Sequence, residues 1–300
     1  MACGNLPPMQ DSYDRAAEDL GNVVALEHVN TRIPDQQLAT AFYVSGLGLT
    51  RDPYLMTGTG NMWVNVGRSQ FHLPTGAPQV VRGRVGIVLP GRAALLARLA
   101  KAHKPLHGTR FEFAEHEGFV EVASPWGNVI RCHEPGPRFG RIRLGMPYVE
   151  LDVPPGAAQG IVRFYREIVG APARHAADER AAHVPVGPDQ ELVYRETDGP
   201  LPAYDGHHVQ IYIADFSGPH RRLAERGLVT EESDQHQYRF TQLVDPASGK
   251  PLFALEHEVR SMRHPLYARP LVNRNPEQTN LQYAPGYDAA QAAQSHAEWS

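Results

Sequence analysis

Short alternations of apolar and polar residues recur along this chain, and four of them open in the same way. Each begins with a large polar residue and continues as a strand, and the openings are 56, 64 and 60 residues apart. The four stretches are 28–33, 84–89, 148–153 and 208–213. Their lead residues are His28, Arg84, Tyr148 and His208. Because a nearly fixed period indicates copies of one structural unit, the chain is predicted to contain four such units with equivalent lead positions.

In the first two units, the pattern after the opening strand changes to helical spacing and then back to short strands. Helices are predicted over 36–45 and 93–102, each followed by three strands, so a unit has the order β-α-β-β-β. A Pro- and Gly-rich stretch at 135–140 indicates a linker. The predicted division is an N-terminal extension, two domains of two units each, and a C-terminal extension that is partly disordered. Their ranges are 1–21, 22–136, 145–260 and 261–300.

Composition narrows the classes of function. The chain has 300 residues and a formal charge of -4, with no basic stripe, so neither nucleic acid nor an anionic membrane is expected as a partner. No apolar run reaches the roughly 18 residues of a membrane helix, and a cytoplasmic protein is expected. The two cysteines, Cys3 and Cys132, are too few for a cysteine metal cage. A small molecule is the expected partner, and a homodimer stays open.

Further repeated features point to a known superfamily. Phe42 and Phe164 each stand six residues before a glycine, Gly48 and Gly170, at the end of a predicted helix. Similar turns at 124–128 and 245–249 precede the last strand of the second and fourth units. Together with the four strand openings, these features resemble the vicinal oxygen chelate superfamily over residues 22–260. The four-unit length is similar to that of the extradiol ring-cleavage dioxygenases.

This resemblance implies an α+β fold with four βαβββ modules, paired into two vicinal oxygen chelate domains whose sheets are open and curled. It also implies a divalent metal on the floor of a sheet, with ligands from the first and last strands of the modules. Side chains that point to one face of adjacent strands can converge on a single ion.

The resemblance offers a first candidate metal site in the C-terminal domain. His208 and Glu256 stand at expected ligand positions, and Tyr148 or Glu150 would supply the third ligand. The other member of that pair would act as acid or base, so Tyr148 and Glu150 are the expected catalytic residues. Fe(II) is the favoured ion, because the extradiol sites that this one resembles bind iron with two histidines and one carboxylate, although Tyr148 stands here at the position of the second histidine.

A competing candidate lies in the N-terminal domain, where His28 and His72 are the alternative ligands. Arg84 and Arg131 stand where the family places other ligands, and two guanidinium groups oppose a cation. They are instead expected to hold a carboxylate or phosphate group of a substrate by paired hydrogen bonds.

The resemblance therefore implies a metal-dependent enzyme of the vicinal oxygen chelate type. The reaction expected first is that of an extradiol dioxygenase, an oxidoreductase acting on a catechol-like or hydroxy-carbonyl small molecule. Two alternatives stay open: a metal-free protein that binds or sequesters a small molecule, and a glyoxalase-type isomerase or lyase that uses His28 and His72.

Overall fold

The computed structural model describes residues 15–55 and 58–282, and these residues form four units of one helix and several strands. A short 3₁₀ helix, η1 (Arg15–Glu18), precedes the first unit. The first unit consists of β1 (Val23–Asn30), α1 (Gln36–Ala39), the π-helical turn η2 (Thr40–Gly46), β2 (Thr50–Arg51), β3 (Asn61–Val66) and β4 (Ser69–Pro74). The second consists of β5 (Gly83–Val88), α2 (Arg92–Ala102), β6 (Glu112–His116), β7 (Phe119–Ala123) and β8 (Val129–His133).

The second half of the chain repeats this order after a 3₁₀ turn, η3 (Pro137–Phe139), in the predicted linker. The third unit consists of β9 (Gly145–Val153), α3 (Ala158–Phe164), η4 (Tyr165–Val169), β10 (Arg174–Ala176), β11 (Ala181–Gly187) and β12 (Gln190–Glu196). The fourth consists of β13 (His208–Ile213), α4 (Ser217–Ala224), β14 (Val229–Asp234), β15 (Gln237–Val244) and β16 (Pro251–Ser261). The predicted βαβββ units and α+β class are confirmed.

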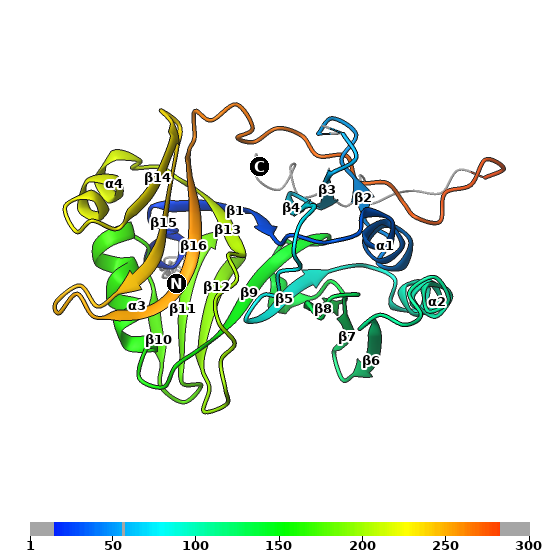
Figure 1. Cartoon of the computed structure of the whole chain (residues 1–300), viewed down its shortest axis with the longest axis horizontal. Coiled ribbons are helices and arrows are strands. Elements are labelled where there is room, and N and C mark those ends of the chain that lie inside the picture. Colours follow the sequence, from blue (N-terminus) through cyan, green and yellow to red (C-terminus); the bar gives the residue numbers. More distant parts are fainter. Residues whose placement is uncertain (1–14, 56–57, 283–300) are drawn as a thin grey trace, which may run out of the picture.

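The units combine into two eight-stranded mixed sheets (Figure 1). The first sheet has the order β14-β15-β16-β13-β1-β4-β3-β2, and the second has the order β10-β11-β12-β9-β5-β8-β7-β6. Units one and four therefore share a sheet through the antiparallel pair β1·β13, and units two and three share the other through β5·β9. The expected combination of units one with two and three with four is not the one seen in the sheets, because β1 pairs with β13 of the fourth unit and β5 pairs with β9 of the third. The domain ranges 22–136 and 145–260 stay a prediction.

The core lies on the helix-covered faces of the sheets and explains the local pattern. Phe42 and Tyr43 on η2 are buried, and Tyr43 packs with Phe71 of β4, while Phe164 on α3 packs against Phe240 of β15. Large apolar side chains at helical spacing bury their area against the alternate residues of the strands, which accounts for most of the stability of such a layer. The polar residues of the same strands are left for the other face.

The C-terminal segment after β16 crosses the first sheet and binds the first unit (Figure 1). Asn273 donates to the carbonyl of Gly67 at 2.8 Å and accepts from its N–H at 3.0 Å, and Arg269 donates to Asp52 at 2.7 Å. Of the predicted extensions, residues 1–14 and 283–300 lie outside the described residues, and so does the disorder expected there. No helix in the described part of the chain is both long and apolar enough to cross a membrane.

Candidate metal centre

The antiparallel pair β1·β13 brings the lead residues of the first and fourth units together. In the strand register His28 lies opposite Gln210 and Asn30 lies opposite His208, while the parallel neighbour β16 places Glu258 next to Gln210. These residues alternate with buried Val29, Val209 and Val259, so they share the face opposite the core. Nitrogen atoms of His28 and His208 and a carboxylate oxygen of Glu258 all lie within 4.8 Å of one another.

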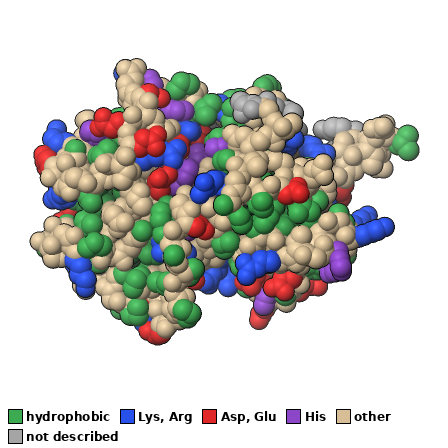
Figure 2. Space-filling view, in the orientation of Figure 1, with side chains coloured by type: hydrophobic (Ala, Val, Ile, Leu, Met, Phe, Trp, Pro, Cys, Tyr) green, Lys and Arg blue, Asp and Glu red, His purple; other side chains and the backbone are tan. Residues whose placement is uncertain are grey.

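The surface of the molecule is polar where β13 and β16 lie. Histidine side chains appear beside arginine and acidic ones near the centre of the face in Figure 2, where β13 and β16 lie in Figure 1. The cluster itself is buried, with His28 at 0% and Glu258 at 3% exposure. Donors that are held in a buried cluster are spared the reorganisation that surface ligands would need.

A β-bulge in β1 adds a carboxyl group to the cluster. The register shifts between Leu26 and His28, and the side chain of Glu27 therefore lies on the same side of the sheet as that of His28. An oxygen of Glu27 lies 3.1 Å from Nδ1 of His28, and the same carboxyl group accepts from Tyr212 and Arg260 at 3.1 Å each. Burial raises the pKa of Glu27, while Arg260 and the Tyr212 hydroxyl oppose that shift.

These contacts determine which nitrogen of His28 is available. Burial holds the pKa of His28 well below its ordinary value, so the ring is neutral. When Nδ1–H donates to Glu27, Nε2 carries the lone pair, as in ligating histidines whose second nitrogen is held by a carboxylate. Nε2 of His28 has no hydrogen-bond partner among the described residues, and the same holds for Nε2 of His208.

The donor set fits a divalent cation. Two atoms that bind one ion at about 2.1 Å lie roughly 3–3.5 Å apart, and Nε2 of His208 lies 3.5 Å from Glu258 Oε2. Burial alone would raise the pKa of Glu258, but His208, His28, Arg260 and Arg239 lower it well below its ordinary value, so the carboxylate is ionised. Glu258 also accepts from Arg239 and Arg260. A carboxylate has about four lone-pair positions, which leaves room for an ion beside these arginines.

The charges around the cluster also favour a cation. Three carboxyl groups, on Glu27, Glu256 and Glu258, face the two guanidinium groups of Arg239 and Arg260. The excess of carboxyl groups lowers the electrostatic cost of a dication, and the buried site weakens solvent screening.

The structure brings the two competing candidate sites into one. His28, expected in one site, and His208, expected in the other, have ring centroids 5.9 Å apart. His72 lies next to them, with its ring 5.5 Å from that of His28 and stacked on Trp63 at 3.7 Å. Glu256 contacts Nδ1 of His208 at 3.2 Å, on the ring edge away from Nε2. Glu258 therefore belongs to the cluster in place of the predicted Glu256.

The prediction of the third ligand has to be corrected. Tyr148 and Glu150 are on β9 and belong to the other sheet. The Tyr148 hydroxyl pairs with His133 at 2.9 Å, and Glu150 accepts from Arg84 at 2.8 Å. The expectation that one of them completes the His208 site is wrong, because β13 pairs with β1 and not with β9.

The predicted substrate anchors also lie in that second sheet. Besides Glu150, Arg84 binds Asp152 at 2.9 Å, and Arg131 binds Glu121 at 2.9 Å. Their charges are matched by neighbouring carboxylates. The order of strands in the two sheets also contradicts a site that these arginines share with His28.

Three residues at the cluster were missed. Glu27 lies just before the predicted strand opening at His28, and a bulge leaves no simple trace in the alternation. Glu258 shares a strand face with Glu256, and only the register distinguishes them. Gln210 is 0% exposed, and neither its amide oxygen nor its amide nitrogen has a hydrogen-bond partner in the part of the chain described. Its signal in the sequence was its position two residues after His208.

Comparison with known proteins gives matches at the level of structure. No family model matches the sequence, and no curated protein matches it. Among solved structures, a "putative dioxygenase" from Bacillus subtilis subsp. subtilis str. 168 is 16% identical with a TM-score of 0.53, covering 81% of this chain and 86% of that one. Glyoxalase I from Zea mays is 12% identical with a TM-score of 0.51, covering 79% of this chain and 92% of that one.

These identities are low, so the likeness concerns the fold. The repeated βαβββ units, the two open mixed sheets and structural matches over about four fifths of the chain agree with the resemblance seen in the sequence. This chain has the fold of the vicinal oxygen chelate superfamily.

Proposed function

We propose that this chain is a metal-dependent enzyme of the vicinal oxygen chelate type, with His28, His208 and Glu258 as ligands of a divalent ion. The observation that carries the proposal is that the buried Nε2 atoms of both histidines make no hydrogen bond among the described residues and lie beside an ionised carboxylate. Buried polar atoms without partners are uncommon in folded proteins and call for a bound group. Two histidines and one carboxylate suit Fe(II) best.

When bound, such an ion acts as a Lewis acid toward two neighbouring oxygen atoms of a small substrate. The side chains around it then orient those oxygens. The amide nitrogen of Asn30 lies 2.6 Å from Nδ1 of His72. Because this amide N–H donates to Nδ1, the neutral His72 ring carries its proton on Nε2. Burial lowers the pKa of His72 to about 2, which keeps the ring neutral at physiological pH.

His72 and Gln210 supply the polar contacts that a chelating substrate needs. The Nε2–H of His72 is buried without a partner among described residues, and stacking on Trp63 fixes the plane of its ring. The Gln210 amide, between His28 and Glu258 in the register, offers a further donor. Donors that are already oriented toward a developing oxyanion stabilise it without reorganisation.

A catechol-like or hydroxy-carbonyl substrate has the adjacent oxygens that this arrangement would hold, and an extradiol-type ring cleavage is the reaction we favour. The glyoxalase-type alternative uses the same cluster, since His28 and His72 both lie there. Oxygen uptake with catechol distinguishes the two, because an isomerase consumes no oxygen.

The metal assignment is tested by anaerobic reconstitution with Fe(II), gel filtration and elemental analysis. One ion per chain is expected, and His28→Ala, His208→Ala and Glu258→Gln should each abolish stoichiometric binding. Glu256→Gln should retain it. The matched control is His183→Ala, because His183 also pairs with a carboxylate, Glu191 at 2.9 Å, but lies in the other sheet.

Circular dichroism of each variant separates loss of metal from loss of fold. A folded protein that takes up no stoichiometric ion after reconstitution would overturn the proposal in favour of the metal-free binding protein. Retention of metal in folded Glu258→Gln, with loss in Glu256→Gln, would restore the ligand predicted from the sequence.

A further inference from the structure

Asn30 stands between two histidines on the polar face of the first sheet. The parallel pairing of β1 with β4 places Asn30 directly beside His72, and the antiparallel pairing of β1 with β13 places it beside His208. Asn30 is 4% exposed, so its amide meets protein groups rather than bulk water. One side chain of β1 therefore separates His72 from a candidate metal ligand.

The contact of Asn30 with His72 determines where the His72 ring carries its proton. The two side chains meet at 2.6 Å, through the Asn30 amide nitrogen and Nδ1 of the ring. An amide N–H can only donate, so Nδ1 supplies the lone pair and Nε2 carries the proton. Trp63 lies opposite His72 in the strand register and stacks on its ring, with centroids 3.7 Å apart, which fixes the plane of the ring.

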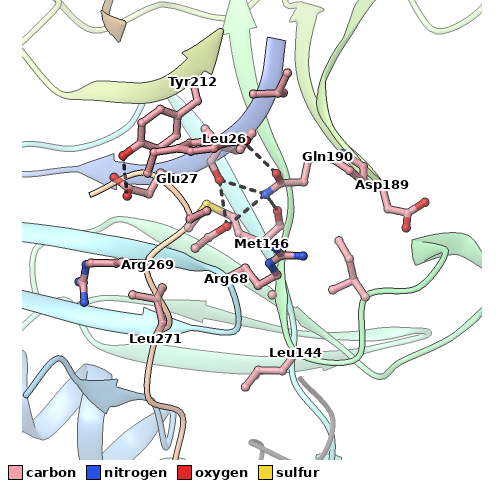
Figure 3. Close-up of a pocket in the computed structure, with 18 of the residues that line it drawn as sticks. Leu26, Glu27, Arg68, Leu144, Met146, Asp189, Gln190, Tyr212, Arg269 and Leu271 are labelled. Atoms are coloured by element: carbon pink, nitrogen blue, oxygen red, sulfur yellow. Dashed lines mark hydrogen bonds between the residues drawn. The ribbon is translucent and has the colours of Figure 1, made fainter. Parts of the chain in front are cut away.

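His28 has the opposite arrangement, because its partner accepts. Nδ1 of His28 lies 3.1 Å from the carboxyl group of Glu27. Tyr212 donates to the same carboxyl group at the edge of a cavity of about 470 Å³ (Figure 3). The His28 proton is therefore on Nδ1 and its lone pair is on Nε2. Two neighbouring rings, with centroids 5.5 Å apart, thus carry their protons on opposite nitrogens.

These tautomers decide which ring can bind an ion, because a neutral histidine binds a metal through the lone pair of a ring nitrogen. Nε2 of His28 offers such a lone pair. In His72 the lone pair of Nδ1 is taken by Asn30, and Nε2 carries a proton. Among the described residues, the donor atoms that lie within 4.8 Å of one another belong to His28, His208 and Glu258, and not to His72.

We propose that Asn30 is a positioning residue, which keeps His72 a hydrogen-bond donor and out of the set of metal ligands. This inference rests on the proposed function. The ion then has three protein ligands, which leaves positions open for two oxygen atoms of a substrate. Nε2–H of His72 is buried without a partner among the described residues, so it is available to one of those oxygens.

The tautomers can be measured on the metal-free, full-length chain by nitrogen-15 NMR of the imidazole rings. The chain has 15 histidines, so the spectra of His28→Ala and His72→Phe assign the two signals. We expect Nε2–H on His72 and Nδ1–H on His28. Asn30→Asp replaces the donor by an acceptor and should move the His72 proton to Nδ1. Asn280→Asp, the same change at an exposed position, should leave both tautomers unchanged.

A second measurement uses 4-nitrocatechol as a chelating probe, with the chain loaded anaerobically with Fe(II). Asn30→Leu removes the amide without adding a charge. It should retain one ion per chain but weaken probe binding by about tenfold or more, because a hydrogen bond to an anionic oxygen is lost. In a His72→Phe background, Asn30→Leu should change probe affinity by less than about twofold, because Asn30 acts through His72.

Nδ1–H on His72 in the unaltered chain, or Nε2–H retained in folded Asn30→Asp, would overturn the inference. Equal effects of Asn30→Leu with and without His72 would also overturn it, since a purely structural role predicts that result. Asn30→Ala takes the place of Asn30→Leu if circular dichroism shows that the latter does not fold.

The two proposals fail in different ways. A chain that takes up no ion would overturn the proposed function, and the role of Asn30 toward the ion with it, even when His72 carries Nε2–H. A chain that binds the ion but carries Nδ1–H on His72 would overturn the role of Asn30 alone.

Discussion

Glu27 shows how one residue in a bulge can control a candidate ligand. Its carboxyl group contacts Nδ1 of His28, and Tyr212 and Arg260 hold that carboxyl group in place. Without this contact, the His28 ring would be free to turn or to change tautomer. A partner of this kind typically contributes a factor of 10–100 to metal affinity.

Glu27→Gln should therefore weaken Fe(II) binding by about 10- to 100-fold without removing it. The expected result is a higher dissociation constant in anaerobic titration, at unchanged stoichiometry. Glu191→Gln is the matched control, because Glu191 binds His183 in the second sheet at 2.9 Å, and it should leave the constant unchanged. Equal constants for Glu27→Gln and the unaltered chain would argue against the positioning role.

At the scale of elements, the turn between β3 and β4 packs against the backbone just before β9 of the other sheet. Gly67 has φ +63°, and a Cβ there would lie 2.0 Å from the carbonyl oxygen of Leu144, just before β9. Backbone atoms cannot yield as a flexible side chain can. Asn273 also binds the N–H and carbonyl of Gly67, so the turn holds the C-terminal segment as well.

Gly67→Ala should destabilise the fold through both backbone strain and this clash. Gly118→Ala, in the β6–β7 turn, is the control: it has φ +86°, with nothing within 4 Å of the added Cβ. The control isolates the backbone cost of about 1–2 kcal/mol. We expect Gly67→Ala to lose about 2 kcal/mol more, in line with overpacking, as measured by urea unfolding. Similar losses in the two variants would mean that the contact with Leu144 relaxes freely.

At the scale of the whole molecule, the C-terminal segment ties the fourth unit back to the first. One of its contacts is the ion pair of Arg269 with Asp52, whose side chain is 0% exposed. Burial alone would raise the pKa of Asp52, but Arg269 and the backbone N–H groups of Leu55 and Tyr54 bring it below its ordinary value. A carboxyl group with a lowered pKa adds stability above its unfolded pKa and loses it as the pH falls through the folded pKa.

Arg269→Ala should cost about 3 kcal/mol of unfolding free energy at pH 7, because it leaves the buried Asp52 without its cation. The difference from the unaltered chain should shrink as the pH falls from 5 toward 3, since Asp52 becomes protonated and needs no partner. Chemical unfolding of both proteins between pH 7 and pH 3 measures this difference in unfolding free energy. Arg263→Ala, at an exposed position on the same segment, is the control. A difference that is independent of pH would indicate lost packing rather than the ion pair.

Much of the fold was predictable from the sequence, because the evidence is local and repeated. The four strand openings, the helix predicted at 36–45 and found at 36–46, and the helix predicted at 93–102 and found as Arg92–Ala102 follow from side-chain periodicity. His28 and His208 could be named as candidates because they hold equivalent lead positions of the repeat, and His72 could be named from the resemblance to the vicinal oxygen chelate superfamily. Periodicity also assigns each residue to a face of its strand.

The tertiary structure decided which of these faces meet. Strand pairing between units depends on contacts between residues far apart in the chain, and the pairing of β1 with β13 joined His28 and His208 while leaving Tyr148 and Glu150 in the other sheet. Register then selected Glu258 over Glu256, and a one-residue bulge turned Glu27 toward His28. The sequence by itself determined the units and their polar faces, whereas the long-range packing of those units decided which side chains form one site.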